Sequence, residues 1–123
     1  MAITLTNRAK NAALNGIVDE IDSGGSAGSL QILDASDTEL ATLPLTNPAF
    51  GAADSGSVSA NTITTDTTVN AGTASKFKVF TSGGSEVFRG TVTNTGGGGD
   101  LTLPNVNLFA GDRLAVSSFI ITI

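Results

Sequence analysis

The spacing of hydrophobic residues changes once along this chain, near residue 28. In residues 7–23 the apolar side chains recur three or four positions apart, at Leu14, Ile17, Val18 and Ile21. This spacing predicts an amphipathic helix of about four turns. Asn7 is a suitable N-cap, and Gly24 and Gly25 follow where a left-handed C-cap is expected. Residues 1–6 alternate apolar side chains with threonine, which predicts a short edge strand or an extended arm.

Beyond residue 28 the apolar positions follow the two-residue alternation of β-strands. The clearest pair is 73–81 and 86–93, joined by Ser82-Gly-Gly-Ser85, which predicts a hairpin with Phe77 and Val79 on one face. Further short strands are predicted at 29–33, 39–45, 57–63, 101–103, near 106–108 and at 113–123. The last of these is apolar on both faces, so we expect its end to be covered on both sides.

One helix followed by roughly eight short strands predicts a mainly β fold. We expect an antiparallel β-sandwich of jelly-roll or Greek-key topology, with one N-terminal amphipathic helix lying against an open edge or face. The 123 residues fit a single domain. Within it, residues 1–6 form the possible arm, 7–23 the helix and 29–123 the sandwich.

The composition removes several classes of function. Six cationic residues are scattered along a chain of net charge -5, so nucleic-acid binding is not expected. Histidine and cysteine are absent, which removes the commonest general base, the thiolate nucleophile and the zinc-thiolate site. We therefore expect no enzymatic activity, no cofactor and no metal site. The chain start does not resemble a signal peptide and no apolar run approaches the ~20 residues of a membrane span, so we expect no membrane partner and synthesis in the cytoplasm.

Two groups of carboxylates are candidate sites. Asp19, Glu20 and Asp22 crowd the last turn of the predicted helix, where the helix dipole disfavours anions by ~0.3–1 kcal/mol each. They form either a solvated end or a docking site for a cationic partner. Asp34, Asp37 and Glu39 lie within six residues and suit either a solvated Asx turn or a calcium site. The turn is favoured, because the EF-hand spacing and its glycine are missing.

Four stretches resemble a family of small tailed-bacteriophage virion proteins. They are Leu-Thr-Asn-x-Ala-x-Asn-Ala-Ala-Leu-x-x-Ile-Val-Asp in the predicted helix, Leu40-Ala-Thr-Leu-Pro-Leu-Thr-Asn-Pro-Ala-Phe-Gly-Ala-Ala53, Gly72-Thr-Ala-Ser-Lys-Phe-Lys-Val-Phe80, and Leu108-Phe-Ala-Gly-Asp-Arg-Leu-Ala-Val-Ser-Ser-Phe-Ile-Ile-Thr-Ile123. They are distributed over nearly the whole chain, from residue 5 to residue 123. The chain departs from the family in its four-glycine run, 96–99, and in its Lys76/Lys78 pair.

The resemblance implies a structural protein of the virion. The expected role is a capsid cement or decoration protein that binds the head shell as a homo-oligomer, with a trimer favoured, through repeated weak contacts. The alternative is a tail, baseplate or fibre subunit. The expected partners are the major capsid protein or other virion subunits. The candidate contact residues are Ile3, Thr4, Leu5 and Thr6, as a strand added to a neighbour, and the acidic group Asp19, Glu20 and Asp22.

Overall fold

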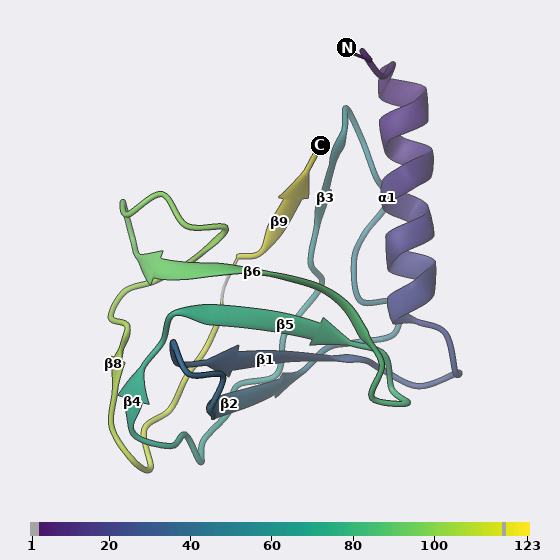
Figure 1. Ribbon diagram of the computed structural model, residues 1–123. Coiled ribbons are helices and arrows are strands. Elements are labelled where there is room, and N and C mark those ends of the chain that lie inside the picture. Colours follow the sequence, from purple (N-terminus) through teal and green to yellow (C-terminus); the bar gives the residue numbers. More distant parts are fainter. Residues whose placement is uncertain (1–2, 117) are drawn as a thin grey trace.

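The computed structural model describes residues 3–116 and 118–123, which form one helix and nine strands (Figure 1). In chain order these are α1 (Asn7–Ile21), β1 (Ser29–Leu33), β2 (Glu39–Pro44), β3 (Ser57–Ser59), β4 (Gly72–Thr73), β5 (Lys76–Phe80), β6 (Glu86–Asn94), β7 (Leu101–Leu103), β8 (Asn107–Leu108) and β9 (Ile120–Thr122). The predicted mainly β fold with one N-terminal helix is therefore confirmed.

Helix α1 forms where the apolar spacing predicts it, and it buries Leu14, Val18 and Ile21. Its N-cap is Thr6 and not Asn7: the Thr6 side chain accepts a hydrogen bond from the N–H of Ala9 at 3.2 Å. A threonine one residue earlier satisfies one of the free N–H groups of the first turn. The helix ends at Ile21, two residues before the predicted end.

A curled sheet of five strands, in the order β2-β1-β5-β6-β7, forms the body of the molecule (Figure 1). Its centre is the predicted hairpin, in which β5 pairs with β6 and Phe77 lies opposite Gly90. Alternate residues of β5 are buried, with Phe77 and Val79 almost fully covered. The period-two pattern thus identified both the strand and its inner face.

Strand β7 runs parallel to β6, so the predicted antiparallel pairing does not extend to this edge. The chain must reverse twice between Asn94 and Leu101 for β7 to run parallel to β6. The four-glycine run, 96–99, lies in this connection and packs closely against the end of β6. A Cβ at Gly97 would lie 2.8 Å from the Cβ of Thr93 and 3.0 Å from the carbonyl oxygen of Asn94. The Thr93 hydroxyl also accepts a hydrogen bond from the N–H of Gly99 at 3.0 Å. The glycines therefore let the loop approach its own strand closely.

Two smaller antiparallel pairs complete the fold, β3 with β9 and β4 with β8. The predicted strand 57–63 is shortened to Ser57–Ser59, and the predicted strand 113–123 is reduced to Ile120–Thr122. Leu114 makes only an isolated bridge to Asp66. The expectation that the chain end is covered on both sides is wrong, because Ile120 is 52% exposed and Ile123 is 44% exposed.

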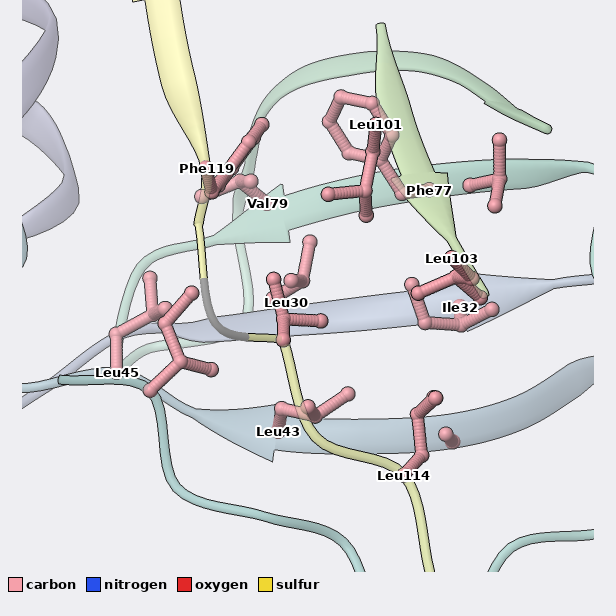
Figure 2. Packing of buried hydrophobic residues seen from close by; sticks show 14 of the residues in the cluster. Leu30, Ile32, Leu43, Leu45, Phe77, Val79, Leu101, Leu103, Leu114 and Phe119 are labelled. Atoms are coloured by element: carbon pink, nitrogen blue, oxygen red, sulfur yellow. The ribbon is translucent and has the colours of Figure 1, made fainter. Parts of the chain in front are cut away.

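The core lies over one face of the five-stranded sheet (Figure 2). Phe119 joins its aromatic part: its ring centroid lies 5.2 Å from that of Phe77, 5.7 Å from that of Phe50 and 6.2 Å from that of Phe88. Phe119 immediately precedes β9, whereas Phe77 lies in β5. The segment before β9 is therefore anchored to the sheet even though it is not a strand itself.

Candidate interaction surfaces

The N-terminal arm, residues 3–6, is predicted as a contact segment, and most of it stands away from the rest of the protein. Ile3 is 72% exposed and Leu5 is 45% exposed, and Thr4 is exposed between them. Thr6 differs from the other three, because its hydroxyl caps α1 and its backbone is extended. The arm therefore offers two apolar side chains to a partner, and Thr6 belongs to the helix.

A second exposed apolar surface lies on β9. Sequence analysis predicts a strand here but not that its surface is exposed. The N–H of Ala60 donates to the carbonyl of Phe119 at 2.8 Å, and the N–H of Ile123 donates to the carbonyl of Gly56 at 3.0 Å. The paired residues Val58 and Ile121 lie midway between these two hydrogen bonds. In an antiparallel ladder this register directs the N–H and C=O groups of Ile120 and Thr122 away from β3. Among the described residues nothing pairs with them. The largely apolar ending was a signal for this strand, but not for its open edge.

The open edge of β9 borders a shallow groove of about 190 Å³. Across the groove lie Phe88, Arg89 and Asp100. The Arg89 guanidinium is held by Glu86 through two hydrogen bonds of 2.8 and 2.9 Å, which raise the pKa of Arg89 and lower that of Glu86. The charge of Arg89 is therefore already paired, the carboxylate of Asp100 accepts hydrogen bonds from Thr91, and the free hydrogen-bonding capacity lies on the backbone of β9.

The arm and β9 lie at the same end of the molecule (Figure 1). Gly56 links α1, which follows the arm, to the residue after β9: its N–H donates to the side chain of Asn11 at 3.0 Å, and its carbonyl accepts from the N–H of Ile123 at 3.0 Å. The exposed Ile3 and Leu5 of the arm and Ile123 after β9 therefore lie at one end, which we call the apolar end.

The predicted acidic group is divided by the structure. Asp19 and Glu20 are exposed at the end of α1 away from the arm. Asp22 is half-buried, and its carboxylate accepts a hydrogen bond from the N–H of Ala49 at 3.0 Å. Two of the three carboxylates are thus available to a partner, whereas Asp22 holds a loop. At 1.5 Å per residue, Asp19 lies about 20 Å from the arm, so the two predicted contact regions are not one site.

The acidic turn at 34–39 is an Asx turn whose carboxylates bind groups of the chain itself. Asp34 accepts from the N–H groups of Ser36 and Thr38, at 2.8 and 2.9 Å. Asp37 pairs with Lys76 at 3.1 Å, which lowers the pKa of Asp37. Glu39 accepts from Gln31 and from Thr42. In residues 3–116 and 118–123 no three acidic side chains are grouped so as to hold a metal ion.

Phe109 is the remaining large apolar side chain on the described surface, with 67% of it exposed. It begins a turn after β8, in which its N–H donates to the carboxylate of Asp112 at 2.9 Å. The other five phenylalanines are buried or half-buried, so this ring differs from the rest of its type. Sequence analysis did not single it out, because a phenylalanine next to Leu108 fits a strand as well as a turn.

Comparison of the chain with protein-family models, with curated proteins and with solved structures gives no match. Within the described ranges, no helix has the length and apolar character needed to cross a membrane.

Proposed function

We propose that this chain is a structural protein of a bacteriophage particle, and that it acts as a capsid cement or decoration protein on the head shell. The sequence resemblance supports a virion component. The observation that supports a binding role is the arm, in which Ile3 and Leu5 are exposed while the helix behind it is firmly capped by Thr6.

An arm of this kind suits addition to the edge of a partner's sheet. The backbone of Thr6 is already extended, with φ -71° and ψ 160°, and apolar and threonine side chains alternate ahead of it. In strand addition the backbone supplies the affinity and alternate side chains supply the specificity. Ile3 and Leu5 would then enter pockets of a shell subunit, and Thr4 would face the other side.

Such a contact is small, so firm attachment to the shell requires many copies of the protein. A short arm buries far less than the ~800 Å² per partner of a typical stable interface. Repetition over a shell and association between copies multiply weak contacts into firm attachment. A homo-oligomer bound to the major capsid protein or to other virion subunits meets this need. We further propose that the strands pack as a sandwich of jelly-roll or Greek-key topology.

The alternative function is a tail, baseplate or fibre subunit that contacts a surface. Phe109 favours it, because its exposed ring lines one groove together with Asn105 and Asn107, and an aromatic ring beside amide side chains is suited to stack on a sugar. The number of copies in purified particles separates the two functions. Hundreds of copies on the head support cement, and a few copies on the tail reject it.

The cement function is tested by binding to shells assembled without this protein. Ile3→Asp is expected to weaken binding at least tenfold, because a charged group cannot enter an apolar pocket without a large desolvation penalty. Thr4→Asp is the matched control, since it adds the same charge on the other side of the arm. Equal binding by wild type and Ile3→Asp would reject the role of the arm.

The melting temperature separates this role from a structural one. Deletion of residues 2–5 leaves the Thr6 cap in place, so the melting temperature should change little while shell affinity falls. A large fall in melting temperature would instead mean that the arm packs into its own sheet.

A further inference from the structure

The outer face of α1 has no partner within the described part of the chain. Figure 1 shows the helix at one flank of the molecule, with the strands on one side of it only. Between Arg8 and Glu20, the exposed residues define what we call the outer helix face: Arg8, Ala9, Ala12, Ala13, Asn15, Gly16, Asp19 and Glu20. The middle of this face carries small side chains, whereas solvent-facing helix positions usually carry long charged ones.

The charges on this face oppose the helix dipole at both ends. Arg8 lies in the first turn, where the dipole favours anions, and Asp19 and Glu20 lie in the last, where it favours cations. None of the three side chains is held by an ion pair or hydrogen bond within the described residues. The chain itself therefore provides no compensation for this arrangement.

Gly16 is a second feature without an explanation inside the chain. A Cβ built at Gly16 would meet nothing within 4 Å. Gly16 lies inside α1 and does not have a positive φ, so its backbone conformation does not require glycine. Glycine in the middle of a helix is unfavourable relative to alanine, so a residue with no internal use is kept at the centre of the face. A glycine at such a position allows the backbone of another molecule to approach closely.

The outer helix face is complementary to itself. Its exposed residues lie at equal numbers of positions before and after Leu14, in the pairs 8 and 20, 9 and 19, 12 and 16, and 13 and 15. If a second copy of α1 packs antiparallel to the first with the two Leu14 residues at the same height, Arg8 of each copy lies opposite Asp19 and Glu20 of the other. The charged contact therefore occurs twice. The same operation brings the alanine and glycine positions together at the centre. It also sets each positive helix end beside a negative one.

We infer that two copies of this chain associate through α1, in an antiparallel contact with two-fold symmetry. The cationic partner suited to Asp19 and Glu20 is then Arg8 of a second copy. In a two-fold contact each residue pair occurs twice, so one complementary pair contributes two ion pairs. This symmetry differs from the trimer that the sequence resemblance favours.

The contact is expected to be weak, because its area is small. A helix of 15 residues is about 22 Å long and about 10 Å wide, so the face covers roughly 220 Å² of a partner. This is well below the ~800 Å² per partner of standard interfaces. Association is therefore expected at high protein concentration, or where many copies are held close together. Added salt should weaken it, because exposed ion pairs are screened.

Charge exchange tests the inference on the purified chain by sedimentation equilibrium at low salt. Arg8→Glu alone and Asp19→Arg alone each place like charges opposite one another, and each should raise the dissociation constant about tenfold. An equal mixture of the two variants should associate nearly as well as wild type, since every contact then joins opposite charges. The R8E/D19R double variant should do the same.

The melting temperature of the monomer provides the control. Both single substitutions place a charge that the helix dipole favours, so they should leave the melting temperature unchanged or raise it. A loss of association together with equal or higher stability cannot come from misfolding. The experiment needs no phage particle, so its result and that of the shell-binding test are independent.

Single cysteines give a second readout, because the natural chain has none. A mixture of Ala9→Cys and Asp19→Cys chains should cross-link through a short reagent more readily than either variant alone. A wild-type chain that stays monomeric at every concentration, a trimer indifferent to both charge substitutions, or a mixture no better than the single variants would overturn the inference.

Discussion

The carboxylate of Asp22 accepts a hydrogen bond from the backbone N–H of Ala49 at 3.0 Å and so ties the end of α1 to a distant loop. Ala49 is 1% exposed, so its N–H is shielded from water in the folded protein. We expect Asp22→Ala to lower the free energy of unfolding by about 1–3 kcal/mol, because a buried donor is left unpaired.

Urea denaturation checks this value. Asp22→Asn keeps an oxygen acceptor and should cost less than the alanine variant. Glu20→Gln, two residues away and exposed, should change stability by less than about 0.5 kcal/mol. Equal effects at Asp22 and Glu20 would contradict a structural role for Asp22.

Asp66 makes stability depend on pH. Burial raises its pKa, but hydrogen bonds from Thr68 and from the N–H of Thr42 outweigh burial, so the pKa of Asp66 is lowered in the folded protein. The ionised carboxylate therefore stabilises the fold at pH above the unfolded value of about 4, and this contribution is lost as the pH falls through the folded pKa. Asp100, whose pKa is lowered by hydrogen bonds from Thr91, acts in the same direction.

The expected result is a free energy of unfolding that falls as the pH is lowered from about 5 to about 2. Asp66→Asn should be less stable at neutral pH and should show a smaller fall over this range. Denaturation curves at a series of pH values measure both. Parallel profiles for wild type and Asp66→Asn would show that Asp66 is not a source of the dependence.

Gly90 is needed because the ring of Phe77 lies directly against it. A Cβ at Gly90 would lie 2.6 Å from a ring carbon of Phe77 and 2.9 Å from a carboxylate oxygen of Asp100. The ring has little freedom to move, since it also packs edge-on against Phe119. Gly90→Ala should therefore destabilise the protein by about 1–3 kcal/mol.

Gly16→Ala is the matched control in the same thermal denaturation experiment. Its Cβ would meet nothing within 4 Å, so we expect the monomer to gain about 0.5–1 kcal/mol from the better helix former. A loss of stability at Gly16, or none at Gly90, would contradict the packing described for these sites.

Phe119 connects the aromatic residues of three separate segments. It is 4% exposed, and its ring lies near those of Phe50, Phe77 and Phe88. Phe119→Ala should lower the free energy of unfolding by about 3–5 kcal/mol, the usual cost of a large cavity. Phe109→Ala removes the same side chain from the surface and should have little effect, as calorimetry of both variants would show.

The sequence alone determined the helix, the central hairpin and the inner face of each. These features depend on neighbours in the chain: the spacing of Leu14, Val18 and Ile21 sets one face of a helix, and alternation sets Phe77 and Val79 on one face of a strand. Local propensity and periodicity act within a few residues, so they can be recognised in the sequence without knowledge of the fold.

Only the tertiary structure decided which strands pair and which groups stay open. Alternation assigns a residue to a face but names no partner, so the parallel β6–β7 edge and the open edge of β9 were not predictable. Asp19 and Asp22 have the same side chain three residues apart, yet only Asp22 reaches the N–H of Ala49. That difference arises from a contact with a residue distant in the sequence, and such contacts exist only once the chain has folded.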